Sequence, residues 1–362
     1  MSGPIPRPGI LEIEAYQGGK SSAVSFEGKL SSNESALGTS PKAREAFGDA
    51  AAILHRYPDG GSLELRKAIA AHHGLETDRI VCGFGSDDLL QLMCRGYAGP
   101  GDEVLYSQHG FLVYPIAAQS VGATPVAASD DGYVASVDSL LDAVTEKTKL
   151  LFLANPNNPT GTYLTSDELT RLHAGLPDHV ALVVDGAYAE YVDADDYDSG
   201  LDLAREAPNV LMTRTFSKIY GLAALRLGWA YGPEDIIGVL NRLRGPFNVS
   251  LPAQAAGVAA LEDQAFVDQV RTHTSHWREW LRQRIRGMGL SVVRGSANFL
   301  LINMGTAEQA AAADEFLREQ GWYLRRMDAY GFPEHLRLTV GTEDENHGVT
   351  EALVRFLEQG DV

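Results

Sequence analysis

Apolar residues recur along this chain with two alternating periods, which predict a succession of strands and helices. Short runs rich in Val, Leu and Ile, such as 150–154 and 181–185, are typical of buried strands, whereas the spacing of Leu65 and Ile69 is typical of a helix. Strands that alternate with helices form a mostly parallel sheet. The predicted strands of this part are 80–82, 103–106, 124–127, 150–154, 181–185, 209–214 and 228–231, and the predicted helices are 61–73, 87–97, 113–121, 137–143 and 166–176.

A second, smaller α/β unit follows a long amphipathic helix at 263–288. Its predicted strands are 299–303, 322–325 and 336–340, and its predicted helices are 307–320 and 346–358. Because 362 residues exceed what one hydrophobic core usually organises, we expect more than one domain. The expected division is an N-terminal arm that contributes to the small domain at 1–42, a large domain at 43–262 and a small C-terminal domain at 263–362.

Composition and charge exclude several classes of function. The chain is 44% hydrophobic and 22% charged, as expected for a folded enzyme, and its net charge of −18 disfavours nucleic acid and anionic membrane surfaces as partners. An anionic ligand therefore needs a local cluster of arginines. Two cysteines support neither a disulfide framework nor a zinc site, and we expect no metal. With no apolar run long enough to span a bilayer and no signal-peptide pattern at the start, a reducing cytoplasm is the expected location.

Polar residues follow two of the predicted strands, where sheets of this type place their ligands. Residues 155–161, Asn-Pro-Asn-Asn-Pro-Thr-Gly, form an irregular loop that can hold an amide beside a ligand, although a simple turn explains such a loop equally well. Asp185 ends a Val-rich strand, where a buried carboxylate needs a partner, and Tyr188 lies three residues on. Capping of a helix is the alternative role for Asp185.

A lysine, Lys218, follows the predicted strand 209–214. Its amine can form a Schiff base with an aldehyde cofactor, although a loop lysine is more often a solvated charge. The chemical interpretation rests on co-occurrence, because a pyridinium nitrogen needs a carboxylate, a phosphate needs hydroxyls and arginine, and a phenolate needs amide and phenol donors. Thr215, Ser217 and Arg226 supply the hydroxyls and the arginine.

Residues 83–88, Gly-Phe-Gly-Ser-Asp-Asp, lead from a predicted strand into a helix, where free backbone N–H groups and the helix dipole form an anion site. The segment does not match a dinucleotide-binding fingerprint, because Asp88 stands where that pattern requires its third glycine.

Taken together, these motifs resemble the fold type I pyridoxal-phosphate aminotransferases, and within them the histidinol-phosphate aminotransferases. The resemblance covers nearly the whole chain. It implies an α/β fold, with a mostly parallel central sheet of the seven-stranded type in a large cofactor-binding domain and a smaller α/β domain. The motifs occur in the family's order and spacing: Asn158-Pro159-Thr160-Gly161, Asp185 with Tyr188, Ser217-Lys218 with Arg226, and Leu336-Arg337-Leu338-Thr339-Val340-Gly341.

The resemblance also implies pyridoxal 5'-phosphate as the cofactor and assigns its ligands. Lys218 forms the Schiff base and, once released, moves a proton on the substrate carbon. Asp185 stays ionised against the pyridinium, and Asn158 and Tyr188 donate to the 3' oxygen. The cofactor phosphate sits on the backbone amides of Ser86 and Asp87, with Thr215, Ser217 and Arg226 completing its cradle, and Tyr57 of a second copy reaches the same phosphate, which implies a homodimer.

Three positions depart from the family's pattern. His109, within Gln108-His109-Gly110-Phe111, stands at the position expected to stack on the cofactor ring, where many members have Tyr; packing under a loop is its alternative role. Residues 31–35, which include the expected substrate ligand Asn33, lack the usual Asn-Pro ending, and Asp88 replaces a common Glu. All three lie in loops near the substrate or the cofactor.

The remaining expectations concern the substrate. The resemblance implies that Arg337 binds the α-carboxylate of glutamate, that Arg325, rather than its neighbour Arg326, binds the phosphate of histidinol phosphate, and that Tyr16 closes over the substrate. The expected reaction, in histidine biosynthesis, converts histidinol phosphate and 2-oxoglutarate to imidazole-acetol phosphate and glutamate.

Three alternatives stay open from the sequence alone: an aromatic amino acid aminotransferase, a phosphoamino-acid decarboxylase that uses the same cofactor, and a catalytically silent binding subunit. The presence of both Lys218 and Asp185 argues against the last, since the loss of either residue would be the simplest route to silence.

Overall fold

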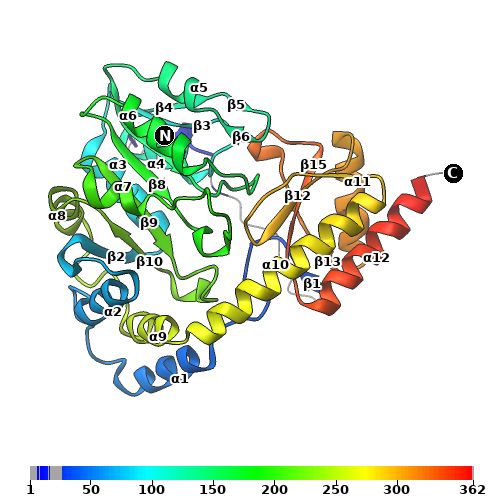
Figure 1. Cartoon of the computed structure of the whole chain (residues 1–362), viewed down its shortest axis with the longest axis horizontal. Coiled ribbons are helices and arrows are strands. Elements are labelled where there is room, and N and C mark those ends of the chain that lie inside the picture. The colour runs from blue at the N-terminus through cyan, green and yellow to red at the C-terminus, as the bar shows by residue number, and fades with distance from the viewer. Residues whose placement is uncertain (1–5, 8, 15, 17–26, 361–362) are drawn as a thin grey trace, which may run out of the picture.

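The computed structural model describes residues 6–7, 9–14, 16 and 27–360 and arranges them around a large and a small β-sheet (Figure 1). The large sheet has seven strands in the order β2-β10-β9-β8-β7-β3-β4. All neighbouring pairs are parallel except those of β10, which is antiparallel to β2 and β9, so the predicted mostly parallel sheet is confirmed. The strands are β2 (Ile80–Phe84), β3 (Glu103–Ser107), β4 (Thr124–Ala128), β7 (Thr148–Ala154), β8 (Ala181–Asp185), β9 (Val210–Thr215) and β10 (Leu227–Tyr231).

The large sheet is buried on both faces, which explains its continuous apolar runs. On β7, Leu150 and Phe152 point into one hydrophobic cluster, whereas Leu151 and Leu153 point into the other, because successive side chains of a strand face opposite ways. Helices α3 (Ser86–Tyr97), α4 (Val113–Val121) and α8 (Glu234–Leu243) cover one face. The other face is covered by α2 (Leu63–His73), α5 (Val137–Asp142), α6 (Ser166–Gly175), α7 (Leu201–Glu206) and α9 (Leu251–Glu262), with α1 (Pro41–Ala50) packed on α9.

The small sheet has four strands in the order β11-β12-β15-β14. Its outer face packs on α10 (Gln264–Gly287), α11 (Ala307–Glu319) and α12 (Glu343–Gly360), of which α10 runs as one long helix from the large part to the small one (Figure 1). The strands are β11 (Ser291–Val292), β12 (Phe299–Asn303), β14 (Arg325–Arg326) and β15 (His335–Thr339), and two short pairs lie apart from both sheets, β1 (Gly28–Lys29) with β13 (Trp322–Tyr323) and β5 (Asp130–Asp131) with β6 (Val134–Ala135).

Side-chain caps fix several helix starts that the sequence signals. Thr165 and Glu168 form a capping box at α6, and Thr306 and Gln309 form another at α11. Ser40 caps α1, whose first residue is a proline, a residue well suited to the first helical turn.

Some predictions were wrong or incomplete. The single strand predicted at 322–325 is two strands, because β13 pairs with β1 whereas β14 pairs with β15. The sequence interpretation did not identify α1, α7, α8 and α9; α8 has a usable signal in the spacing of Ile236 and Leu240, whereas α9 is alanine-rich and has no clear apolar face. The three-part domain division stays a prediction. Within the described residues, no helix is both long and apolar enough to cross a membrane.

Candidate active site

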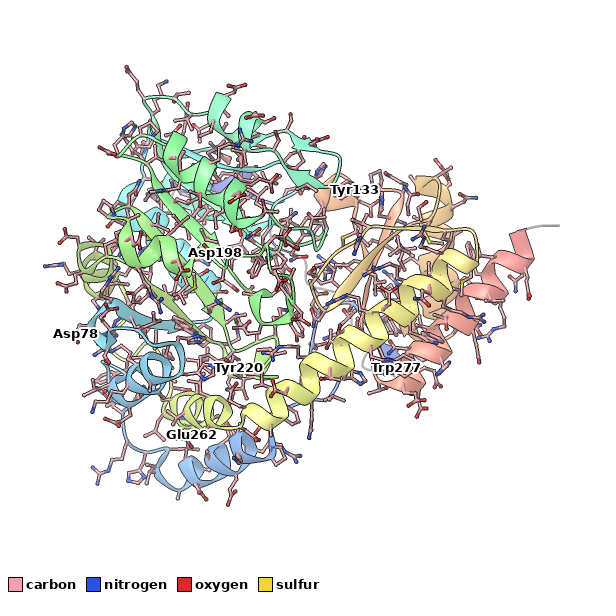
Figure 2. The ribbon with its side chains drawn as sticks, viewed as in Figure 1. Asp78, Tyr133, Asp198, Tyr220, Glu262 and Trp277 are labelled. Atoms are coloured by element: carbon pink, nitrogen blue, oxygen red, sulfur yellow. The ribbon has the colours of Figure 1, made fainter. Side chains whose placement is uncertain are left out.

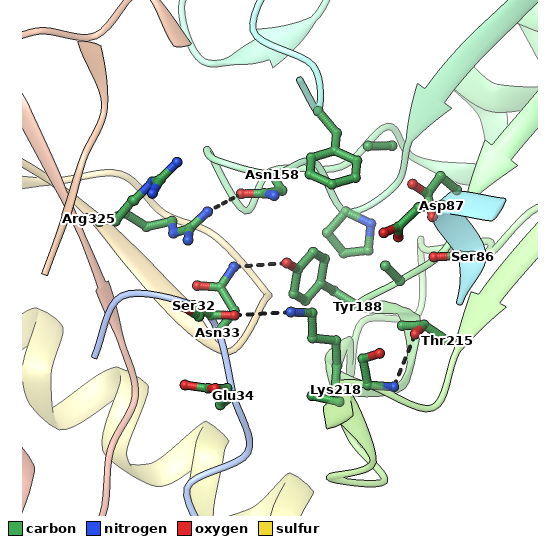
Figure 3. A pocket seen from close by; sticks show the side chains of 18 of the residues that line it. Ser32, Asn33, Glu34, Ser86, Asp87, Asn158, Tyr188, Thr215, Lys218 and Arg325 are labelled. Atoms are coloured by element: carbon green, nitrogen blue, oxygen red, sulfur yellow. Dashed lines mark hydrogen bonds between the residues drawn. The ribbon is translucent and has the colours of Figure 1, made fainter. Parts of the chain in front are cut away.

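A cavity of about 300 Å³ lies at the carboxyl ends of the large sheet's strands, between that sheet and the small one (Figure 3). Thirteen of the fifteen residues expected at the site line it, and His109 and Tyr57 do not. The thirteen are Tyr16, Asn33, Ser86, Asp87, Asn158, Asp185, Tyr188, Thr215, Ser217, Lys218, Arg226, Arg325 and Arg337.

Asp185 lies at the end of β8 with its carboxylate held by two hydroxyl groups. Tyr114 Oη donates to Oδ2 at 3.0 Å, and Thr213 Oγ1 donates to Oδ1 at 3.1 Å. Burial raises the pKa of Asp185 to about 6, although these two hydrogen bonds act in the opposite direction. A carboxylate this buried has a strong preference for a cationic partner in the cavity.

Lys218 follows β9 and its amine enters the same cavity. Lys218 Nζ donates to the backbone carbonyl of Ser32 at 3.2 Å and lies 5.7 Å from the centre of the Tyr188 ring (Figure 3). Burial lowers the pKa of the amine to about 8, and the positive charge of Arg337 lowers it further, whereas Asp87 and Glu34 act in the opposite direction. About a tenth of the amine is therefore uncharged and nucleophilic at pH 7, far more than for an ordinary lysine.

The N-terminus of α3 forms an anion site at one end of the cavity. The helix begins at Ser86, and Gly85, its N-cap residue, has a positive φ of 83°. This helix start lies directly over β10, because a Cβ added at Gly228 would come within 2.4 Å of Ser86 N. The first backbone N–H groups of α3 have no partner within the helix, so they can bind an anion.

Arg226 completes this anion site from the loop between β9 and β10. Its Nη1 donates to Ser217 Oγ at 3.3 Å, and its Nη2 donates to Asp87 Oδ2 at 3.1 Å. Thr215 Oγ1 accepts a hydrogen bond from the backbone N–H of Ser217 at 3.0 Å, which fixes the loop that carries Lys218. Hydroxyls, backbone amides and a guanidinium are the donor set that a phosphate needs.

Two arginines of the small sheet form the opposite end of the cavity. Arg325 on β14 lies directly across from Arg337 on β15. Leu336 and Leu338, on either side of Arg337, point toward the outer helices, so the alternation of the strand turns Arg337 toward the cavity. Arg326 is turned away, and its guanidinium pairs with Asp328, which agrees with the preference for Arg325. Arg337 Nε is buried without a hydrogen-bond partner.

A chain of hydrogen bonds joins this end of the cavity to the middle. Arg337 Nη1 donates to Asn158 Oδ1, which leaves the Asn158 amide group free to donate. Asn33 Nδ2 donates to Tyr188 Oη at 2.8 Å, and Thr339 Oγ1 donates to Asn33 Oδ1 at 3.2 Å. Burial raises the pKa of the Tyr188 phenol, so this group stays a donor.

Several cavity residues were missed in the sequence. Phe111 lines the cavity and touches Tyr16 edge to face, with ring centroids 6.4 Å apart, and Tyr330 is a further aromatic wall. Ser32 supplies the carbonyl partner of Lys218. The sequence signal for Phe111 is an aromatic residue in the loop after a parallel strand, two residues beyond His109. Of the segment Tyr16-Gln17-Gly18-Gly19, only Tyr16 is among the described residues.

His109 and Tyr57 lie outside the cavity lining. The His109 ring is stacked on Phe332 with centroids 3.9 Å apart, so its position does not support the expected stacking on a cofactor ring. Tyr57 is 80% exposed and stacks on Phe247 with centroids 4.4 Å apart. Within the residues that the structure describes, no group of three His, Cys, Asp or Glu could hold a metal ion.

Comparisons with known proteins agree with this geometry. The model of the family "Aminotransferase class I and II" matches residues 28–353. The chain is 53% identical over 361 residues to the histidinol-phosphate aminotransferase of Paramagnetospirillum magneticum, covering 99% of both chains, and 52% identical over 358 residues to that of Rhodospirillum rubrum, covering 98% of this chain and 97% of the relative. The structure matches that of histidinol-phosphate aminotransferase from Sinorhizobium meliloti in complex with pyridoxal-5'-phosphate, with a TM-score of 0.92, 25% identity and 99% of both chains covered.

The raised pKa of Asp185 predicts that the free energy of unfolding of the ligand-free protein depends on pH. Because the folded pKa of about 6 lies above the ordinary Asp pKa of 3.8, the native state holds a proton that the unfolded chain loses, and stability falls as the pH rises from 4 to above 6. Asp185→Asn lacks this carboxylate, so its free energy of unfolding relative to wild type is expected to rise by about 2 kcal/mol between pH 4 and pH 7.

The measurement is urea unfolding of the ligand-free proteins at several pH values. Asp178→Asn is the matched control, because Asp178 is exposed in the loop before β8, and its difference from wild type is expected to stay flat. A difference for Asp185→Asn that does not change with pH would contradict the prediction.

Proposed function

Because the chain belongs to the class I and II aminotransferase family, in which its close relatives are histidinol-phosphate aminotransferases, we propose that it moves an amino group from histidinol phosphate to 2-oxoglutarate. The products are imidazole-acetol phosphate and glutamate, and the reaction belongs to histidine biosynthesis. The observation that carries this proposal is a single cavity that combines a buried lysine and a buried aspartate with two arginines on adjacent strands.

The cavity fits pyridoxal 5'-phosphate, the cofactor of this family. The donor set around Ser86 and Arg226 suits its phosphate, Asp185 suits its ring nitrogen, and Lys218 has an amine with a lowered pKa for its aldehyde. When bound, the cofactor supplies an electron sink for the carbon that carries the amino group. The absence of a Cβ at Gly228 provides the room in which the start of α3 and its free amides reach the phosphate end.

The protein's own groups hold the cofactor in one orientation. Ser86 and Asp87 would contribute backbone amides to the phosphate, and Thr215, Ser217 and Arg226 would contribute hydroxyls and a guanidinium. Asp185, fixed by its two hydroxyl partners, stays ionised beside a positively charged ring nitrogen. Asn158 and Tyr188 would donate hydrogen bonds to the ring's oxygen, and Phe111, which lines the cavity where His109 does not, would contact the ring.

Lys218 is the residue that handles the proton. Its amine, with a pKa near 8, accepts the proton from the substrate carbon that bears the amino group. The backbone carbonyl of Ser32 accepts a hydrogen bond from Nζ, which holds the amine in the cavity between transfers. Tyr16 closes the outer side of the cavity and excludes water from this step.

The end of the cavity formed by β14 and β15 binds the anionic end of each substrate. Arg337, with an Nε that lacks a partner, binds the carboxylate of glutamate or 2-oxoglutarate. Histidinol phosphate brings a dianion to the same place, and Arg325, directly across the strand pair, adds the second guanidinium that this charge favours. Asn33 lines the substrate side and keeps the Tyr188 hydroxyl in place.

We expect the active form to be a homodimer in a reducing compartment such as the cytoplasm. Exposed apolar side chains lie around Tyr57, including Ile53 at 46%, Leu54 at 63% and Phe247 at 47% exposed, and a second copy can cover them. Tyr57 would then reach the phosphate of the partner's cofactor.

Both cysteines are buried free thiols, which suits a reducing compartment; isolation of the chain from a periplasmic fraction would contradict this location.

Replacement of Lys218 tests the reaction class. Lys218→Ala removes the nucleophile and the base, so kcat/KM is expected to fall by at least about 10³-fold, and the visible absorbance band that wild type gains with pyridoxal phosphate is expected to be absent. Borohydride treatment followed by mass spectrometry should add the cofactor to the peptide with Lys218 in wild type only. Lys149→Ala on β7, outside the cavity, is the control, and an increment that persists in Lys218→Ala would contradict the assignment.

The two arginines are expected to differ in their effect on the two substrates. Arg325→Ala should lower kcat/KM for histidinol phosphate by about 10- to 100-fold and that for glutamate much less, whereas Arg337→Ala should lower both. The measurements are the two half-reactions, and Arg326→Ala, which removes a guanidinium paired outside the cavity, is the control. Equal losses in Arg325→Ala would remove the case for a phosphate ligand, and a phenylalanine rate constant about tenfold above that for histidinol phosphate would indicate an aromatic aminotransferase instead.

The assembly is tested by light scattering on the holoenzyme. A mass of twice the 39.1 kDa of one chain is expected for wild type, and Leu54→Asp is expected to shift the mass toward the monomer, because it places a charge in an apolar contact. Leu11→Asp replaces a leucine that is 76% exposed, against 63% for Leu54, and that lies far from Tyr57 in the sequence, so it is the control. A monomeric wild type with full activity would contradict the homodimer.

A further inference from the structure

A cluster of aromatic and titratable side chains joins the two parts of the molecule beside the cavity. His109, Asp130 and Tyr133 come from the large part, Phe332 comes from the segment that leads into β15, and His335 is the first residue of β15. Figure 2 places Tyr133 at the edge of the large part that faces the small sheet. The proposed function uses none of these contacts.

Asp130 fixes the His109 ring from the large part. Its Oδ2 lies 3.0 Å from His109 Nδ1 and accepts a hydrogen bond from the His109 backbone N–H at 3.2 Å, while its Oδ1 accepts from Ser107 Oγ at 2.7 Å. The Asp130 side chain is 1% exposed and the His109 side chain 12%. Because Oδ2 is an acceptor, Nδ1 carries a proton, so the ring has one orientation.

The fixed ring packs on the segment from Met327 to Phe332. Its face stacks on Phe332 at 3.9 Å and 25°, and its Cδ2–Nε2 edge faces Gly331, where an added Cβ would lie 3.5 Å away. Tyr133 reinforces the contact, since its hydroxyl lies 3.0 Å from His335 Nε2 and its ring touches Phe332. The large part thus holds the end of this segment and the first residue of β15.

The segment from Met327 to Phe332 and the strand β15 that follows it carry residues that line the cavity. Tyr330, two residues before Phe332, lines the cavity, and Arg337 lies two residues after His335 on β15, facing the same way along the strand. Arg325 pairs across to Arg337. On the other side, the His109 carbonyl accepts a hydrogen bond from Asn157 Nδ2, next to Asn158. A shift of the ring would therefore move the substrate wall relative to the cofactor loop.

We infer that His109, oriented by Asp130, is a positioning residue that holds the substrate-binding wall against the large sheet through its stack on Phe332. This role rests on the proposed function for its kinetic consequence, and it differs from contact with the cofactor. The two roles predict opposite outcomes when the ring is removed, because a positioning residue changes substrate binding whereas a cofactor contact changes cofactor binding and absorbance.

The test compares the holoenzymes of His109→Ala, Phe332→Leu, Asp130→Asn and the double variant His109→Ala/Phe332→Leu. An aromatic stack of this kind corresponds to about a two- to tenfold change in an equilibrium, so KM for histidinol phosphate is expected to rise by about that factor while kcat stays within about twofold. The double variant is expected to be no worse than the worse single variant, because both remove the same contact. The absorbance band and the cofactor concentration for half-reactivation should match wild type. His276→Ala, an exposed histidine on α10, is the control.

Hydrogen exchange of the peptide that covers 327–335 gives a readout that does not depend on the substrate. His109→Ala is expected to speed exchange there by at least about threefold, because the segment loses its anchor. Three outcomes would each overturn the inference. The first is an altered absorbance band with unchanged KM and unchanged hydrogen exchange. The others are additive effects in the double variant and unchanged hydrogen exchange in all variants. A wild type without activity on histidinol phosphate would contradict the proposed function alone, since the exchange result would stand.

Discussion

The site depends on one electrostatic constraint: a carboxylate and an amine are buried in the same cavity without neutralising each other. Asp185 has hydroxyl partners and Lys218 has a backbone carbonyl, so each group stays available to a ligand. Burial moves both pKa values toward neutrality, upward for the acid and downward for the amine. The fold tolerates this cost because the groups lie at strand ends of a sheet whose two faces are packed with aliphatic side chains.

The sheet topology explains how residues far apart in sequence meet. The carboxyl ends of parallel strands lie at one edge, which brings the start of α3, Asp185 and the Lys218 loop to one place. The small sheet then supplies what the large sheet lacks, a wall of positive charge. On β15, strand alternation alone decides that Leu336 and Leu338 face the helices while Arg337 faces the cavity. A net charge of −18 therefore coexists with a cationic binding wall.

Local pattern predicted the large sheet, most helices and the polar residues at the strand ends, because strand ends and glycine-rich turns leave signals in the sequence. The substrate-side residues Tyr16, Asn33, Arg325 and Arg337 were expected only from the resemblance to the family. Contacts that depend on tertiary packing left no such signals. The place of β13 beside β1, the antiparallel direction of β10 and the carbonyl of Ser32 beside Lys218 all come from segments distant in the chain. His109 shows most clearly what the sequence cannot predict. Its position in the family's pattern suggested a contact with the cofactor ring, but Asp130 and Phe332 determine where the His109 ring lies.

The parallel pairing of β1 with β13 has a consequence for biosynthesis. Gly28 is synthesised well before its partner, Trp322, which lies 294 residues later in the chain. The large sheet is complete at β10, so it can fold while the N-terminal strand waits undocked and the lysine's carbonyl neighbour at Ser32 is still displaced. The carbonyl of Ser32 can therefore reach the Lys218 amine only once β13 is in place, because β1, just before Ser32, pairs with β13.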